Sequence, residues 1–193
     1  LRRLFGDEAV RETIRATPSV RVVILNHPRN VHSSFQPFAA TNFNAVTGEN
    51  LRGFEFTFDA IEVANSSALQ TDWRRSFTDW FALLNYGYRL TAVGSSDGHD
   101  VSRYIVGQGR TYVACDDSNP GRINVEEACQ SFLAGRALVS LGLLTRMTVD
   151  DKYGVGDLAK SLGDQIKVSI SVFGPSWAGA ERIELYANGE KVR

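Results

Sequence analysis

The sequence predicts an α/β fold in its first part and a small antiparallel β-rich region in its last part. Three observations support this. Short apolar runs of the kind found in buried parallel strands occur early, and amphipathic helical patterns lie between them. After about residue 140, apolar and polar residues alternate, as in half-buried antiparallel strands. We therefore expect a partial α/β unit over residues 1–115 and a helix with a β-rich region over residues 116–193.

The α/β part is predicted to begin with a helix and a buried strand. Residues 4–16 carry apolar residues at helical spacing among charges, and Pro18 ends that pattern. Residues 20–25 form a nearly continuous apolar run rich in Val and Ile, which predicts a strand buried on both faces. This strand runs directly into the tetrapeptide Asn-His-Pro-Arg at 26–29.

Two more strands and a helix follow. A long polar connection over 30–53 leads to a strand predicted at 58–65, and a third strand is predicted at 90–94. Residues 72–87 are amphipathic, and Gly87 is a plausible C-terminal cap. We interpret the apolar stripe of this helix as core packing; its members are Trp73, Phe77, Trp80, Phe81 and Leu84.

The last part is predicted to hold one short helix and several antiparallel strands. The helix spans 124–134 and ends at Gly135. The dipeptide Asn188-Gly189 is a strong signal for a two-residue hairpin. The strands are predicted at 137–141, 145–150, 166–173 and 181–186.

Composition and charge exclude some classes of partner. The 193 residues have a formal net charge of -1 and no basic stripe, so nucleic acid is not expected as a partner. No apolar run reaches the length of a membrane span. Residues 1–17 lack the apolar core of a signal peptide but say nothing about export. We interpret Cys115 and Cys129 as two ordinary reduced thiols.

The residues best suited to chemistry follow the ends of two predicted strands. His27 comes after the first strand, and the triplet Asp97-Gly98-His99 comes after the third. On an extended segment, residues i and i+2 point to the same side, so Asp97 and His99 are expected to serve one metal or two neighbouring metals. Carboxylate and imidazole together suit zinc, manganese or iron.

Each of these signals has a plainer interpretation. Asp-Gly is a common turn, and an Asp-x-His triplet alone is weak evidence for a metal. The strand-end position, the second His-bearing strand end and the small residues Ser95 and Ser96 favour the metal interpretation. His32, in the polar connection, is best interpreted as a solvated loop residue.

Charged residues outside this set have two interpretations. Glu62 lies inside a predicted strand, where an unpaired buried carboxylate would be costly, so it faces either solvent or cations. Arg29, Arg103 and Arg110 are suited to gripping an anionic substrate, although each is more often a surface arginine.

The ordered set of motifs resembles the PHP superfamily (polymerase and histidinol phosphatase), most of all the CehA-like branch of metal-dependent phosphoesterases, which includes a carbaryl hydrolase. The resemblance covers nearly the whole chain and would make it the C-terminal part of such a protein. The segments that carry it are 26–29 (NHPR), 58–65 (FDAIEVAN), 80–87 (WFALLNYG), 91–99 (TAVGSSDGH), 109–113 (GRTYV), 135–136 (GR) and 184–189 (ELYANG).

The resemblance implies a fold, metals and a reaction. It implies the C-terminal portion of a distorted (β/α)7 barrel with up to three divalent metals (Mn, Zn or Fe) at the strand ends. Asp97 and His99 match the family's last ligand pair, and His27 matches its His-Pro ligand. Glu62 and Asn65 match a strand that borders the site. A metal-bound hydroxide would attack the phosphorus of a small phosphorylated substrate.

The chain also departs from the family pattern. It contains no His-x-His motif, and Gly98 stands where the family usually has Ser. The chain alone is therefore expected to be inactive and to bind metal weakly or not at all. Two other functions stay open: a degenerate, non-catalytic domain whose β-rich part binds carbohydrate or protein, and a carbamate or ester hydrolase that uses the same metals.

Overall fold

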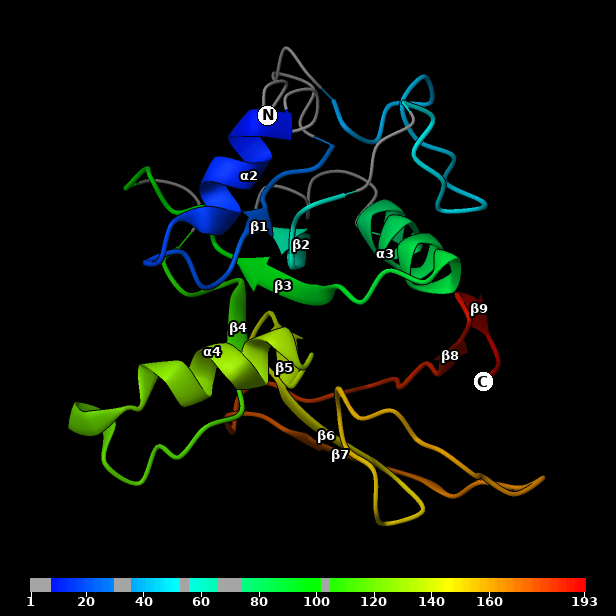
Figure 1. The fold of residues 1–193 in the computed structure, drawn as a ribbon. Coiled ribbons are helices and arrows are strands. Elements are labelled where there is room, and N and C mark those ends of the chain that lie inside the picture. The colour runs from blue at the N-terminus through cyan, green and yellow to red at the C-terminus, as the bar shows by residue number, and fades with distance from the viewer. Residues whose placement is uncertain (1–7, 30–35, 53–55, 66–73, 102–104) are drawn as a thin grey trace.

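The computed structural model describes residues 8–29, 36–52, 56–65, 74–101 and 105–193 (Figure 1). Helix α2 spans Glu8–Ala16 and agrees with the predicted first helix over the part that is described. Three residues singled out in the sequence, His32, Trp73 and Arg103, lie outside the described residues.

A three-stranded parallel sheet forms the centre of the α/β part. Its strands are β1 (Ile24–Leu25), β2 (Ala60–Asn65) and β3 (Thr91–Ser95), in the order β1-β2-β3. Helix α3 (Arg74–Tyr86) connects β2 to β3 and packs against β2. Because all three strands run the same way, their carboxyl ends share one edge of the sheet.

The first strand is shorter than the sequence predicts. Its ladder begins only at Ile24, although the carbonyl of Val23 accepts the backbone N–H groups of both Asp59 and Ala60. The N–H of Val23 donates to the Asp59 carboxylate at 2.9 Å, so this residue is fixed by a side chain rather than by the ladder.

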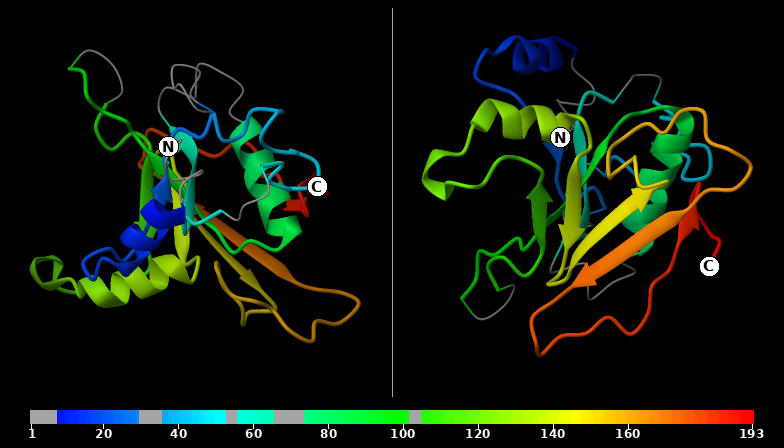
Figure 2. Two further views of the ribbon diagram at one scale, coloured as in Figure 1. Left: turned by 45° about the horizontal axis from the view of Figure 1, so that its top comes forward. Right: turned by 90° about the horizontal axis from the view of Figure 1, so that it is seen from below.

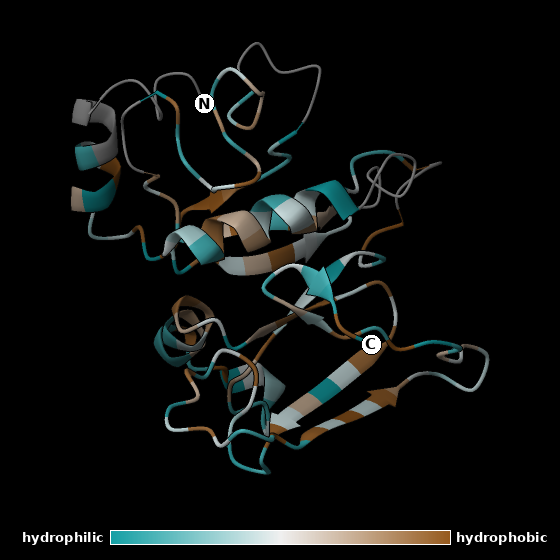
Figure 3. Cartoon of the chain, turned by 90° about the vertical axis from the view of Figure 1, so that its right-hand side faces the viewer, coloured by the Kyte–Doolittle hydropathy of each residue, from teal (hydrophilic) through white to brown (hydrophobic). Residues whose placement is uncertain are grey.

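The core lies between the sheet, α3 and the segment before β2. The phenylalanines of this segment, Phe38, Phe43, Phe56 and Phe58, contact one another ring to ring. The prediction that Leu84 belongs to the buried apolar stripe of α3 is wrong, because Leu84 is exposed. The buried residues of α3 are Asp79, Ala82 and Leu83. In the hydropathy colouring of Figure 3, hydrophilic and hydrophobic residues alternate along the ribbon of this helix.

The last part consists of paired antiparallel strands, a short 3-10 helix and an α-helix (Figure 2). β4 pairs with β5, β6 with β7, and β8 with β9, each as a separate two-stranded sheet. The bounds are β4 Arg110–Val113, the 3-10 helix η2 Pro120–Arg122, α4 Val125–Leu133, β5 Ala137–Ser140, β6 Leu144–Val149, β7 Val168–Phe173, β8 Tyr186–Ala187 and β9 Glu190–Lys191.

The prediction that this chain forms the C-terminal portion of a (β/α)7 barrel is wrong. The described chain has several small sheets and no closed barrel. A barrel needs strands that are hydrogen-bonded on both edges, but within the described segments β1 and β3 each pair only with β2. The next strand, β4, contacts β3 through the Thr111 side chain but pairs antiparallel with β5, which lies beyond residue 115, so the parallel succession stops at β3. Over the described residues, no helix has the length and apolar character to cross a membrane.

Candidate functional site

Two of the predicted site residues meet at the carboxyl edge of the parallel sheet. His27 follows β1 and Asp97 follows β3, and the distance from His27 Nε2 to Asp97 Oδ1 is 3.9 Å. Both side chains are partly exposed, at 42% and 31%. The sheet therefore brings together an imidazole nitrogen and a carboxylate oxygen that are 70 positions apart in the chain, and both stay accessible to solvent.

Both residues have left-handed backbone conformations. The φ angle is +39° at His27 and +49° at Asp97. Aspartate and histidine adopt such angles more readily than most residues, and Asp150, Asp151 and Asn188 share them elsewhere in the chain. At Asp97 the angle also interrupts the extended conformation expected for residues 97–99, so strand geometry alone does not place Asp97 and His99 on one side.

The buried carboxylate of Glu62, in the middle strand, fixes both flanking strand ends. Its Oε2 accepts the backbone N–H of His27 at 2.7 Å. Its Oε1 accepts a short hydrogen bond from the Ser95 hydroxyl and a longer one from Asn65 Nδ2, at 3.3 Å. Glu62 is only 3% exposed. The sequence predicts that Glu62 faces either solvent or cations, and both alternatives are wrong. Backbone and side-chain hydrogen-bond donors bind its carboxylate instead.

The loop that carries Asp97 is closed at its base. The chain returns to the end of β3 at Gly109, where a Cβ would lie 2.2 Å from the carbonyl oxygen of Ser95. The Thr111 hydroxyl donates to the carbonyl of Gly94 at 2.8 Å and accepts the Gly94 N–H at 2.9 Å. Only a residue without a side chain at 109 permits this approach, which fixes where the Asp97 loop begins and ends.

His99 lies on the same loop and is exposed. Over the described residues, no three or more His, Cys, Asp or Glu side chains are grouped so that they could hold a metal. The structure therefore brings together His27 and Asp97 and does not add His99 to that pair.

Arg29 takes part in a buried ion pair rather than facing the site. Its Nε and one terminal nitrogen bind the Asp79 carboxylate at 2.5 and 2.6 Å, and the other terminal nitrogen donates to the carbonyl of Phe38 at 2.8 Å. Asp79 is 1% exposed. Burial raises the pKa of Asp79, and the Arg29 guanidinium opposes that rise. With all three nitrogens engaged, Arg29 links the loop after β1 to α3.

The other predicted residues take more peripheral positions. Arg110 is exposed and begins β4, and Asn65 ends β2 beside Glu62. Cys115 and Cys129 are both free thiols. Sequence reasoning missed the roles of Asp79, Thr111 and Gly109, because each acts through a contact with a distant segment that no local pattern marks.

Comparison with known proteins adds no relative. No protein-family model, curated protein or solved structure matches the chain. A function for this chain is therefore inferred from the geometry of His27 and Asp97 and from the residues that carry the resemblance.

Proposed function

We propose that this chain carries part of the metal site of a divalent-metal hydrolase that cleaves phosphoesters, as the PHP resemblance implies. The observation that supports it most is the 3.9 Å approach of His27 Nε2 to Asp97 Oδ1 at a shared edge of strand ends. Sites in parallel α/β sheets are built at that edge.

The two side chains have the chemistry of metal ligands. Imidazole nitrogen and carboxylate oxygen bind zinc at about 2.0–2.2 Å, so two ligands of a tetrahedral zinc ion lie about 3.4 Å apart. The His27 and Asp97 atoms lie 3.9 Å apart, so we propose that a bound cation would draw the two side chains slightly together. We propose His99 as a further ligand because it is exposed on the same loop. The sequence has no His-x-His motif, so we propose that residues outside these 193 complete the site.

The residues of this chain would bind the cation and hold the strand ends in place. A bound divalent cation would polarise a phosphoryl oxygen and lower the pKa of a coordinated water. His27 would offer Nε2 to the cation, and Asp97 would offer Oδ1. Glu62 acts as a positioning residue, since it binds the backbone of His27 and the hydroxyl of Ser95. Outer partners of this kind fix ligand orientation in metal sites.

The test is hydrolysis by the protein encoded by the complete gene. Its substrates are 4-nitrophenyl phosphate, bis(4-nitrophenyl) phosphate, 4-nitrophenyl acetate and an aryl carbamate, each with added MnCl2 or ZnCl2. We expect turnover of a phosphate substrate, and we expect Asp97→Ala and His27→Ala each to lower kcat/KM by at least about 100-fold. Arg122→Gln, at an exposed arginine of η2, is the control and should leave the rate unchanged.

Other outcomes decide against the proposal. Turnover of the acetate or carbamate alone would make the protein an ester or carbamate hydrolase. Absence of turnover, with no metal bound after purification in manganese or zinc, would favour the non-catalytic alternative. A phosphatase rate that Asp97→Ala does not change would remove Asp97 from the site.

A further inference from the structure

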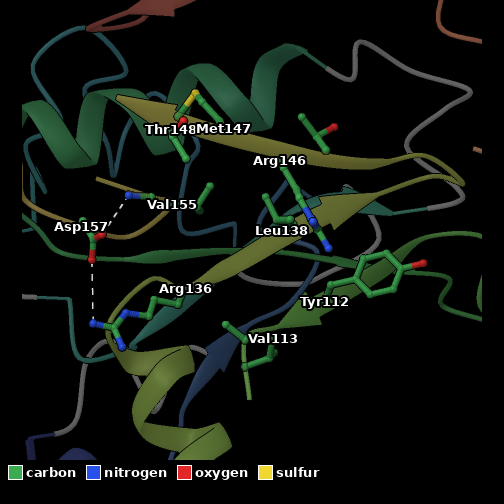
Figure 4. Close-up of a pocket in the computed structure, with 12 residues that line it drawn as sticks. Tyr112, Val113, Arg136, Leu138, Arg146, Met147, Thr148, Val155 and Asp157 are labelled. Atoms are coloured by element: carbon green, nitrogen blue, oxygen red, sulfur yellow. Dashed lines mark hydrogen bonds and ion pairs between the residues drawn. The ribbon is translucent and has the colours of Figure 1, made fainter. Parts of the chain in front are cut away.

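A cavity in the antiparallel part lies apart from the strand-end residues of the parallel sheet. Its volume is about 470 Å³, and it is bordered by β4, β5, β6 and the loop 154–157 (Figure 4). This volume falls in the range of small-molecule sites, about 300–1,000 Å³. Nothing in the proposed hydrolase reaction uses this cavity.

The pairing of β4 with β5 determines which side chains of these strands share the cavity wall. Tyr112 is paired with Leu138, so both side chains lie on the same face of the pair. The carbonyl of Arg136 accepts the N–H of Ala114 at 3.0 Å, which continues this pairing beyond the ends of the strands. Arg136 lies two residues before Leu138 and therefore shares its face. Arg136 and Leu138 both border the cavity.

A tight turn supplies Val155 and Asp157 to the same cavity. Asp157 Oδ2 accepts the N–H of Gly154 at 2.9 Å, and the N–H of Asp157 donates to the carbonyl of Gly154 at 3.2 Å. A Cβ at Gly156 would lie 2.6 Å from the backbone of Gly135, so the turn packs closely against the chain that follows α4. The position of Asp157 is therefore fixed by its own turn.

Arg136 and Asp157 lie at one end of the cavity and do not satisfy each other. The closest approach of the two groups is 3.8 Å, between an Arg136 terminal nitrogen and Asp157 Oδ1, and a dashed line marks it in Figure 4. This distance is longer than a hydrogen bond. Their side chains are 54% and 35% exposed, so a ligand can reach both. The cavity therefore presents a hydrogen-bond donor beside an acceptor, and the two charges cancel.

The second arginine of the cavity wall is directed elsewhere. The guanidinium carbon of Arg146 lies 5.3 Å from the centre of the Phe173 ring, and Phe173 does not belong to the described residues that line the cavity. Met147, the next residue of β6, points to the opposite face of that strand. The recognition of a polar group in this cavity therefore falls to Arg136 and Asp157.

We propose that this cavity binds a small neutral molecule with an apolar body and a carboxamide group. The carboxamide oxygen accepts from the Arg136 guanidinium, and the carboxamide N–H donates to Asp157 Oδ1. The apolar body packs on Val155 and Leu138, and Figure 4 shows Val155 between Asp157 and Leu138. A carboxylate binds less well because Asp157 repels it, and an ammonium group binds less well because Arg136 repels it.

Three probes with the same ring and different polar groups test this proposal. The ¹⁵N-labelled chain is titrated with benzamide, benzoate or benzylamine, and the backbone N–H resonances of Gly154 and Val155 report binding at the turn. We expect benzamide to shift both resonances saturably. We expect benzoate and benzylamine each to bind about tenfold more weakly, because each brings a charge against one member of the pair.

Asp157→Asn should reverse the preference. The new side-chain oxygen still accepts the N–H of Gly154, whereas the side-chain nitrogen places a donor where the acceptor was. Both groups then donate, so benzoate should bind about tenfold more tightly than benzamide. Arg136→Met removes the other donor and should weaken benzamide about tenfold. Asp164→Asn, at an exposed aspartate outside the cavity, is the matched control and should change no affinity.

The dispersion of the unliganded spectrum reports whether each variant is folded. Three results would each overturn the proposal: no saturable shift with benzamide, an affinity for benzoate or benzylamine equal to that for benzamide, and an unchanged preference in folded Asp157→Asn. If Asp157→Asn does not fold, Arg136→Met decides, and a benzamide affinity equal to that of the unchanged protein would overturn the proposal.

Discussion

At the residue scale, Glu62 determines whether the strand ends of the proposed site are held together. Its carboxylate accepts from the backbone of His27 on one side and from the hydroxyl of Ser95 on the other. Buried polar groups that lose a partner cost about 1–3 kcal/mol each. One side chain in β2 therefore affects the conformations of both loops that carry proposed ligands.

Glu62→Ala should lower the free energy of unfolding by at least about 2 kcal/mol, because the His27 N–H and the Ser95 hydroxyl both lose their acceptor. Urea denaturation measures the change. Glu181→Ala, at an exposed glutamate, is the control and should have little effect. Stability of Glu62→Ala equal to that of the unchanged protein would show that these hydrogen bonds do not hold the strand ends.

Gly109→Ala tests the base of the Asp97 loop. The added Cβ would lie 2.2 Å from the carbonyl oxygen of Ser95, so the backbone must move. We expect a loss of about 1–3 kcal/mol in thermal or urea unfolding. The matched control is Gly179→Ala, since nothing lies within 4 Å of a Cβ at Gly179. Equal stabilities of the two variants would contradict the close approach.

The sequence marks some of these residues and not others. His27 and Asp97 could be predicted because each follows an apolar strand pattern, and parallel strands end at a common edge. The position of Glu62 in a strand is also visible, but its partners are not. Gly109 and Thr111 owe their roles to the fold of β4 against β3, and such long-range contacts leave no periodic signal.

At the scale of elements, the Arg29–Asp79 pair connects the loop after β1 to helix α3. The pair is bidentate and lies beside the aromatic core. It explains why the buried face of α3 differs from its apolar stripe: an aspartate occupies the core side because an arginine from another element neutralises it. Amphipathic patterns assign such an aspartate to solvent.

Asp79→Ala should destabilise the protein by about 3–5 kcal/mol, because it leaves the Arg29 guanidinium unpaired at a largely buried position. The double variant Arg29→Met with Asp79→Leu removes both charges and should recover part of that loss. Urea unfolding of the three proteins measures both effects. A double variant less stable than Asp79→Ala would contradict this account of the pair.

Most helices and strands lie where periodicity places them, and the exceptions have local causes. β1 is cut to two residues because the Asp59 side chain binds the N–H of Val23. The strand predicted at 181–186 is reduced to its last residue, Tyr186, which pairs with Lys191. The apolar pattern of the sequence does not show whether the parallel sheet closes into a barrel, since closure depends on which strands pair with the two outer strands of the sheet.

At the scale of the whole molecule, the C-terminal hairpin returns to the first part of the chain (Figure 1). Asn85 Nδ2 donates to the carbonyl of Asn188 at 3.0 Å, and the Phe81 and Tyr186 rings stack 6.3 Å apart. The hairpin thus covers Phe81, which the sequence assigns to the main core, whereas Phe77 and Trp80 pack against that core.

Acid should weaken this hairpin. Hydrogen bonds from Tyr186 and Lys191 lower the pKa of Glu184 to about 2, against 4.5 for an ordinary glutamate. Since the folded pKa is the lower one, the contribution of Glu184 is complete above pH 4.5 and is lost as the pH falls toward about 2. Carboxyl ¹³C NMR against pH measures the value. Tyr186→Phe should raise the pKa toward 4.5, and an unchanged pKa would contradict the assigned hydrogen bond.

The central claim is that His27 and Asp97 share one divalent cation, and its most direct test is a zinc titration of this chain followed by ¹⁵N NMR of the histidine rings. We expect the Nε2 resonance of His27 to move saturably and weakly, with one zinc ion per chain, and we expect Asp97→Asn to abolish the saturation. No movement at His27 both in this chain and in the protein encoded by the complete gene, the same binding curve in Asp97→Asn, or a fully occupied cluster of several metals in this chain alone would contradict the claim.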